Sequence, residues 1–414
     1  MSLRFITIAA VAAAAALAGC GERPPMKTTQ LGYRGVAVGQ ISNPRMDAAL
    51  RQVNGIPATP YALDPDDGGE RAGHAYQNVR AVGDLSVDQF NHLMASITQW
   101  VAPPAQGCNY CHNPNNMASD AVYTKVVARR MLQMTRNINA NWTTHVQQVG
   151  VTCWTCHRGN AVPKNVWFED PNVVKHNGMM AGNTRGIGSA GHNSVKYASL
   201  PYDPFTPYLL GAYPIRVQST VPDNGPEVPI KATEATYGLM MHMSGSLGVN
   251  CTYCHNSRAW SDWSQSRPQR VTAWYGIRMV RNVNNQYIQK LAWAMPANRK
   301  GPLGDPYKVN CTTCHQGLAK PLYGVSMRVE HPQLWGPVQK DIGGINLPGV
   351  PANAVPLPNG GIPRFETNSA PHGAPLKVAM PAAAAVPVAG KTAATTVPTA
   401  GKTASAAPVA TPVG

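Results

Sequence analysis

The sequence Cys-x-x-Cys-His occurs four times in this chain, and it limits the possible folds more than any other feature. The motifs use eight of the nine cysteines, and they are Cys108/Cys111/His112, Cys153/Cys156/His157, Cys251/Cys254/His255 and Cys311/Cys314/His315. This spacing is the attachment signature of c-type haem, in which two thiols form thioethers to the porphyrin and the histidine takes one axial position on iron. Paired zinc sites or disulfides do not explain a histidine directly after every second cysteine. The sequence therefore predicts four covalently bound haem c groups.

The stretch from residue 125 to residue 157 carries two candidates for the sixth ligand that each iron needs. Its apolar residues predict an amphipathic helix that begins near Ser119 and carries Met131 and His145. If the helix is continuous, these two side chains lie about 21 Å apart along its axis and about 40° apart around it. Two groups this far apart cannot ligate one iron, so the helix is predicted to serve two different haems.

Two further helices are predicted from capping residues. Ser86 starts a capping box before an apolar helical pattern that reaches residue 101, and Met94 lies on this helix shortly before the first motif. Ser266 starts a second capping box, with Pro268 in the first turn of a helix that is predicted to end near residue 294. A third unit, at 232–255, carries a methionine-rich stretch before Cys251.

The two halves of the chain resemble each other, which predicts a duplicated two-haem module. When residues 125–128 are placed over 270–273, the matching pairs are Met134 with Met279, Arg136 with Arg281, Asn137 with Asn282 and Asn139 with Asn284. The first and third motifs also match in their tyrosine and following asparagine, and Leu93-Met94 matches Leu239-Met240. The predicted fold is mainly α with much loop: a multihaem cytochrome c with two pseudo-twofold-related two-haem halves, each haem on a helix–loop–CxxCH unit.

The repeat also assigns the sixth ligands. Met131 is paired with Gly276, and His145 has no symmetric counterpart because it is paired with Lys290. The economical assignment to the first, second, third and fourth haems is Met94, Met131, Met240 and His145. Met134 and Met279 remain alternatives, as do His242 and Met243 in place of Met240. Six remaining histidines are expected on the surface or in loops: His74, His92, His176, His192, His331 and His372.

If these assignments hold, every iron is six-coordinate, which predicts an electron carrier and not an enzyme. Methionine opposite histidine raises the reduction potential and a second histidine lowers it, so three higher-potential haems and one lower-potential haem are expected. A multihaem reductase would need a five-coordinate iron. A membrane-tethered carrier for a respiratory enzyme would have the same internal chemistry and remains the alternative function.

The N-terminal sequence predicts export and attachment to a membrane. A short apolar run ends in Leu17-Ala18-Gly19-Cys20, which is a lipoprotein-type signal with Cys20 as the lipidated residue. The predicted division is 1–19 signal peptide, 20–83 extended N-terminal segment, 84–170 haem 1/haem 2 half, 171–230 connecting segment, 231–335 haem 3/haem 4 half and 336–414 C-terminal extension, with a disordered Ala/Pro-rich tail from about 379.

The formal net charge of +15 does not indicate nucleic-acid binding, because the chain has no basic helix and no interleaved aromatic and basic residues. A neutral or acidic redox partner suits this charge better.

Several longer motifs carry a resemblance to a known family. They include Arg129-Arg130-Met131, Thr135-Arg136-Asn137-Ile138-Asn139, Gly150-Val151-Thr152-Cys153, Ser246-Leu247-Gly248-Val249-Asn250-Cys251 and Trp274-Tyr275-Gly276-Ile277-Arg278-Met279. Over roughly residues 75–335 the chain resembles the tetrahaem cytochrome c subunit of the purple-bacterial photosynthetic reaction centre. The resemblance implies the same ligand set, namely Met94, Met131, Met240 and His145. By the same resemblance, Arg270 is expected either to raise the potential of the third-motif haem, which in the family lies nearest the pigment, or to be a plain arginine on a helix face.

The resemblance further implies a lipid-anchored subunit on the periplasmic face of the bacterial inner (photosynthetic) membrane. Its implied partners are the reaction-centre L and M subunits, with the H subunit and the light-harvesting complex. It would take electrons from a soluble donor, either cytochrome c2 or a high-potential iron–sulfur protein, and pass them through four haems to the photo-oxidised bacteriochlorophyll special pair.

Overall fold

The computed structural model describes residues 26–30, 39–63, 68–169, 204–212, 215, 229–260 and 262–337. The predicted signal peptide, Cys20, most of the connecting segment and the chain from residue 338 onward lie outside the described residues. The chain divides into two units, 1–373 and 374–414, and every described residue belongs to the first.

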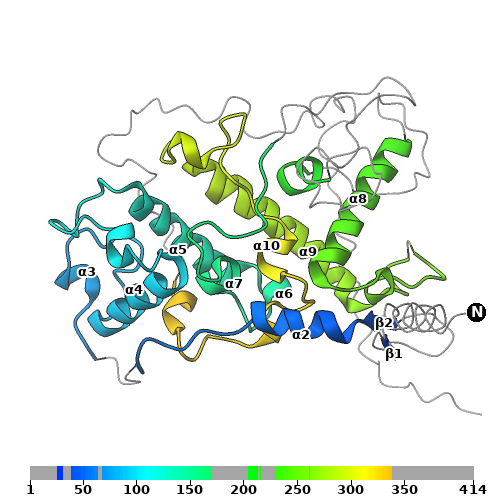
Figure 1. The fold of residues 1–414 in the computed structure, drawn as a ribbon, viewed down its shortest axis with the longest axis horizontal. Helices are drawn as coiled ribbons and strands as arrows, with labels where there is room; N and C mark the ends of the chain where they lie inside the picture. Colours follow the sequence, from blue (N-terminus) through cyan, green and yellow to red (C-terminus); the bar gives the residue numbers. More distant parts are fainter. Residues whose placement is uncertain are drawn as a thin grey trace, which may run out of the picture. The chain divides into compact units, whose positions relative to one another are not determined.

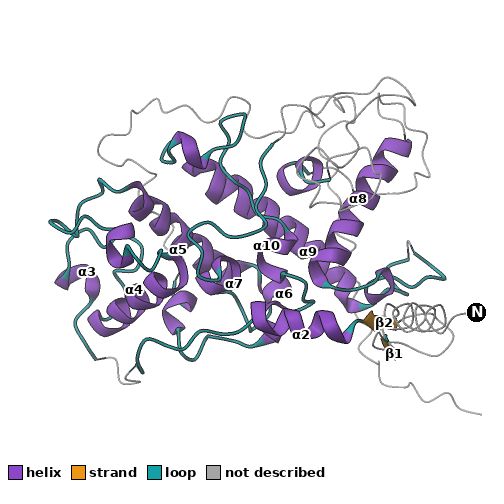
Figure 2. Ribbon diagram, viewed as in Figure 1, coloured by secondary structure: helices purple, strands orange, loops and turns teal. Residues whose placement is uncertain are grey.

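Helices and loops make up nearly all of the described chain, as the sequence predicts (Figure 2). The α-helices are α2 (Pro44–Val53), α3 (Ala72–Ala75), α4 (Val87–Val101), α5 (Tyr123–Asn141), α6 (Thr143–Val146), α7 (Cys153–His157), α8 (Pro229–Leu247), α9 (Pro268–Asn282) and α10 (Cys311–His315). Two π-helical segments are η2 (Thr206–Leu210) and η4 (Val283–Ile288). The short 3-10 segments and turns are η1 (Gly107–Tyr110), η3 (Cys251–Tyr253), η5 (Gln289–Leu291), η6 (Ala297–Arg299), η7 (Pro321–Gly324) and η8 (Pro332–Trp335).

The one sheet among the described residues is small. Strands β1 (Lys27–Gln30) and β2 (Gly39–Ser42) pair antiparallel, with Lys27 opposite Ser42. No helix in the described part of the chain is both long enough and apolar enough to span a membrane.

Helix α4 begins where its capping residue predicts. The Ser86 hydroxyl accepts a hydrogen bond from the backbone N–H of Gln89 at 3.1 Å, which satisfies one of the free donors of the first turn. The helix ends at Val101, before the two prolines at 103 and 104. Its buried side chains include Leu93 and Trp100, so α4 carries an apolar face into the core and places Met94 beside it.

The predicted single helix from near Ser119 through His145 is wrong in two respects. Helix α5 starts at Tyr123, and it stops at Asn141 because Trp142 leaves the helical region with φ −117° and ψ 28°. His145 therefore lies on the separate short helix α6, which follows the break at Trp142 (Figure 1).

The N-cap of helix α9 lies one residue later than predicted. The first-turn position of Pro268 is confirmed, but Arg267 occupies the N-cap. The Ser266 hydroxyl instead donates to the backbone oxygen of Asp262 and accepts from Arg270. The helix continues without a break into the π-helical segment η4.

The predicted surface location is wrong for His92, and His331 is also buried; each is 1% exposed. The rings lie 5.0 Å apart, and His331 packs edge-on against Trp100 at 4.5 Å. The Gln333 amide donates to Nδ1 of His92, whose Nε2 faces the backbone oxygen of Tyr61. His92 is buried because it lies on the face of helix α4 that packs into the core.

We predict that this buried pair makes the protein sensitive to acid. Burial and the neighbouring His92 lower the pKa of His331 to about 4. Because an unfolded histidine has a pKa of about 6.5, the unfolded chain takes up this proton first, and stability falls as the pH drops from about 6.5 to about 4. One pKa unit corresponds to about 1.4 kcal/mol, so the expected loss is at most about 3 kcal/mol, measured as the pH dependence of thermal unfolding. His331→Gln should lose this part of the dependence; an unchanged profile would contradict the assignment.

Candidate haem-binding sites

The four motif histidines share one hydrogen-bonding arrangement. In each case Nδ1 faces a backbone oxygen: Met117 at 2.9 Å from His112, Asn160 at 2.8 Å from His157, Trp260 at 3.0 Å from His255 and Leu318 at 2.8 Å from His315. A carbonyl only accepts, so Nδ1 must carry the proton and donate it. The lone pair is then left on Nε2, which is the nitrogen available to a metal.

The second and fourth motifs are built alike from short helices. Thr152 with Thr155, and Asn310 with Thr313, form capping boxes that start α7 and α10. Each helix ends in a left-handed residue, Arg158 with φ 49° or Gln316 with φ 47°. The side chains of Cys156 and Cys314 lie close enough to interact, so these two motifs meet at their second cysteines.

His145 is brought opposite His315 from a distant part of the chain. Its Nδ1 donates to the backbone oxygen of Thr272 at 2.9 Å, the same arrangement as in the motif histidines. The two rings lie 6.0 Å apart, centroid to centroid, at 66°. With a metal–nitrogen bond of about 2 Å, this separation suits two imidazoles on opposite sides of one metal. Burial lowers the pKa of His145, and burial with His145 nearby lowers that of His315 to about 4, so both rings are neutral.

These two histidines line a cavity of about 300 Å³. Its other lining residues include Cys311 and Cys314 of the fourth motif and Cys254 of the third. The cavity therefore collects an attachment pair and two facing imidazoles in one place, as a covalently attached haem requires.

Gly276 explains why the repeat departs from symmetry. A Cβ added to Gly276 would lie 2.5 Å from Cε1 and 2.7 Å from Nδ1 of His145. Met131 occupies the matching position in the first half, so the imidazole of His145 fills the space that a methionine would need. The sequence shows this glycine, but only the tertiary structure shows what it accommodates.

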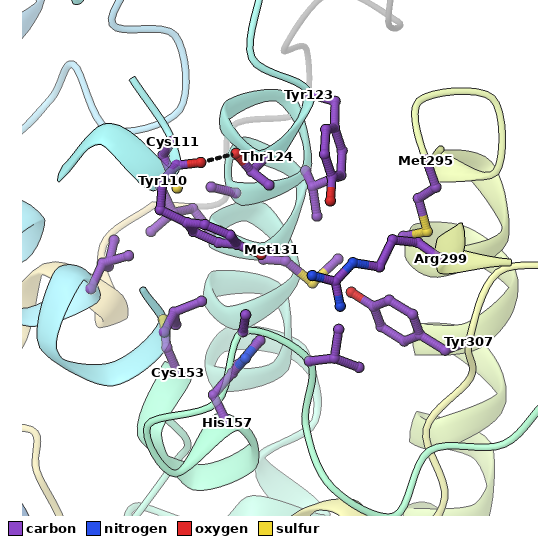
Figure 3. Close-up of a pocket in the computed structure, with 17 residues that line it drawn as sticks. Tyr110, Cys111, Tyr123, Thr124, Met131, Cys153, His157, Met295, Arg299 and Tyr307 are labelled. Carbon is purple, nitrogen blue, oxygen red and sulfur yellow. Dashed lines mark hydrogen bonds between the residues drawn. The ribbon is translucent and has the colours of Figure 1, made fainter. Parts of the chain in front are cut away.

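The second motif lies beside a pocket that contains Met131 (Figure 3). Cys153 and His157 line it, together with Cys111 of the first motif. In Figure 3 the guanidinium of Arg299 lies between the side chains of Met131 and Tyr307. Three tyrosines also line the pocket, and they are Tyr110, Tyr123 and Tyr307. Burial raises the pKa of Tyr307 to about 12, which keeps its hydroxyl neutral.

Met94 lies one helical turn before Thr98, whose hydroxyl is 3.9 Å from the sulfur of Cys108. Residues four apart share a helix face, so Met94 lies on the side of α4 that faces the first motif. Met240 is half-buried on α8 against the largest core cluster.

The alternative ligands are placed as follows. Met134 and Met279 both pack in or against the largest core cluster, as expected for a shared packing role. Met243 lines the cavity around His145, and Met279 also borders it. The ring of His242 is buried, contacts the Ser246 hydroxyl at 3.2 Å and packs edge-on against Phe205.

Buried arginine nitrogens provide a further test of whether haem fits. Arg158 has two buried nitrogens, Nε and Nη1, that have no hydrogen-bond partner among the described groups, and Arg130 and Arg267 each have one. Leaving a charged donor unpaired in the interior is costly. The propionate carboxylates of haem are acceptors that would satisfy these donors. Arg270, in contrast, is bonded to Ser266 and stacks on Trp263 at 3.9 Å.

We predict that Gly276→Ala displaces His145. An alanine favours a helix by about 1 kcal/mol over glycine, so a loss of stability here would report the clash and not helix propensity. We expect one haem to lose its second imidazole, measured as carbon monoxide binding to one haem of the reduced protein. Gly68→Ala is the matched control, because a Cβ there meets nothing within 4 Å. No carbon monoxide binding by the Gly276 variant would contradict the placement of His145.

Comparison with known proteins gives a consistent result. A family model described as the photosynthetic reaction centre cytochrome C subunit matches residues 22–335. The photosynthetic reaction center cytochrome c subunit of Rubrivivax gelatinosus is 50% identical over 338 residues, which cover 81% of this chain and 90% of the relative. The subunit from Thermochromatium tepidum is 48% identical over 327 residues, covering 78% of this chain and 79% of the relative. The chain therefore belongs to the family of photosynthetic reaction centre cytochrome c subunits.

Proposed function

We propose that this chain carries electrons through four covalently bound haem c groups to the photo-oxidised bacteriochlorophyll special pair of a reaction centre. Membership of the family supports photosynthetic electron transfer as the overall role. The observation that carries the proposal furthest is the pairing of His145 with His315. A fifth imidazole, held through its Nδ1 as the four motif histidines are, faces His315 and would close the iron position that a substrate would otherwise need.

The proposed attachment residues are the eight motif cysteines. The proposed axial pairs are His112 with Met94, His157 with Met131, His255 with Met240 and His315 with His145. When bound, each haem supplies reversible one-electron exchange at iron, and the protein sets its potential through the axial ligand. This chain's own contribution is to hold each imidazole by its Nδ1–H and to close the sixth position. An electron carrier needs an oriented imidazole and a closed sixth position, whereas a haem enzyme that acts on a small substrate needs the sixth position open.

We also propose that the halves 84–170 and 231–335 are related by a pseudo-twofold axis. Asn139 on α5 receives the backbone N–H of Val151 and donates to its oxygen, two residues before the second motif. Asn284 does the same with Val309, two residues before the fourth motif. Asn137 lies 3.4 Å from Asn282, its own partner in the repeat. A residue that touches its own counterpart is expected to lie next to the axis.

A further repeat, not identified from sequence, extends this relationship. Residues 207–211 read Pro-Tyr-Leu-Leu-Gly and residues 332–336 read Pro-Gln-Leu-Trp-Gly. The first segment accepts hydrogen bonds from Arg281 and Asn284 of the second half. The second accepts the equivalent bonds from Arg136 and Asn139 of the first half. A segment that follows the first half therefore packs on the second half, and the segment at the end of the second half packs on the first, which supports a single interlocked body.

The proposed partners are the L and M subunits of the reaction centre, with the H subunit and the light-harvesting complex, and a soluble donor. A neutral or acidic donor, such as a high-potential iron–sulfur protein, suits the formal charge of +15 better than a strongly basic cytochrome c2. We place the chain on the periplasmic face of the membrane, held through lipid on Cys20 after removal of residues 1–19. Relatives named as reaction centre subunits support this location.

The proposed role predicts light-driven oxidation of the haems. A short flash given to native membranes should bleach the reduced haem absorption within the sub-millisecond range. The control is the same membrane from cells that lack this chain. Haems that respond only to respiratory substrates in the dark, and not to the flash, would favour a respiratory carrier and refute the proposal.

The proposed symmetry predicts matched losses of stability. Asn139→Ala and Asn284→Ala each remove three hydrogen bonds to buried backbone groups, so each should cost about 3 kcal/mol. Thermal unfolding of the two variants would measure this, with Asn141→Ala as an exposed control on α5. A large loss at one asparagine with none at the other would argue against equivalent roles.

A further inference from the structure

The N-terminal helix α2 joins the second and fourth motifs. The backbone oxygen of Gly55, just after α2, accepts from the indole N–H of Trp154, which lies inside the second motif, at 2.9 Å. Leu50 packs against Gly317, two residues after His315: a Cβ on this glycine would lie 2.7 Å from Cδ2 of Leu50. The sequence indicates no chemistry for residues 21 to about 83, yet this part of the segment contacts both motifs where they meet.

Asn54 forms the C-cap of α2 and contacts the charged side chain of Arg158, which reaches from the second motif to the fourth. Nη2 of Arg158 donates to Oδ1 of Asn54 at 3.1 Å and to the backbone oxygen of Cys314 at 3.4 Å. The Asn54 amide N–H₂ donates to the backbone oxygen of Leu50, which fixes Oδ1 toward Arg158. Asn54 is only 2% exposed, so this arrangement is shielded from water.

The charge of Arg158 is not duplicated by the repeat. Its counterpart at the end of α10 is Gln316, a neutral side chain whose amide donates to its own helix at Thr313. Arg158 follows the motif residue His157 directly, and it also reaches the fourth motif through Cys314. An arginine remains charged at all accessible pH values, and a partly buried charge acts more strongly on its surroundings than one in water. A positive charge shared by two haem positions favours the reduced state of both.

We propose that Asn54 is a positioning residue that holds the Arg158 guanidinium at the junction of the second and fourth haem positions. Through it, the N-terminal helix helps to set the potentials of these two haems and leaves the other two unaffected. This inference rests on the proposed haem assignment. It gives α2 an electrostatic role in addition to packing, because Asn54 is the residue of this helix that hydrogen-bonds the charge.

The test is an equilibrium redox titration of the full-length holoprotein in membranes, with each haem followed by its own absorption band. Asn54→Asp places a carboxylate against Arg158 and partly cancels its charge. At a fixed ambient potential, the ratio of reduced to oxidised haem should fall about tenfold for two haems, which equals a shift of about 59 mV. Asn54→Ala should shift the same two haems in the same direction by less, and it carries the test if the aspartate variant fails to fold.

Asn43→Ala is the matched control. Asn43 caps the opposite end of α2 by accepting from the backbone N–H of Arg45, so its loss weakens the same helix without contact to Arg158. We expect all four ratios to stay within about twofold of the wild type, a change well below one tenfold step. Equal shifts at all four haems, the same shifts in the Asn43 variant, or no shift in either Asn54 variant would overturn the inference. A wild-type protein with fewer than four haems would instead refute the proposed haem assignment.

Discussion

The hydrogen bond from a histidine Nδ1 to a backbone carbonyl is the interaction on which the candidate sites depend. Five imidazoles make it, four from the motifs and one from His145. The bond selects one tautomer, fixes the ring, and leaves Nε2 as the nitrogen that can bind metal. In each motif the accepting carbonyl lies three to five residues after the histidine, so the short turn that follows Cys-x-x-Cys-His is part of the site.

The internal repeat and one of its departures from symmetry concern the same region of the structure. Asn139 and Asn284 tie the two long helices to the segments that precede the second and fourth motifs, with the same pattern of bonds. Within this shared frame, Gly276 replaces the residue that matches Met131, and the imidazole of His145 lies against it. A side chain that follows α5 therefore packs against α9, so the two parts of the chain depend on each other in their packing.

Charges in the interior follow two different patterns. Arg136 is 1% exposed and pairs with Asp84 through two nitrogens, while its remaining bonds go to backbone oxygens. Lys308 is fully buried and pairs with Asp305. Both cations have their partners within the chain: Arg136 joins segments far apart in the sequence, whereas Lys308 pairs within its own loop. Arg158, beside two motifs, keeps two buried nitrogens that have no partner among the described residues, as expected of a charge directed toward a cofactor.

The sequence by itself determined the four attachment motifs, the mainly helical class, the start of α4 at Ser86 and the pairing of Met131 with Gly276. Each of these depends on residues close together in the chain or on a direct repeat. The tertiary structure alone decided the break at Trp142, the burial of His92 and His331, and the placement of α2 over two motifs. His145 bonds a carbonyl 127 residues away, and local helix patterns hold no information about such a partner. Contacts of this range form only when the halves pack together, because packing, and not helix propensity, chooses which side chains face each other.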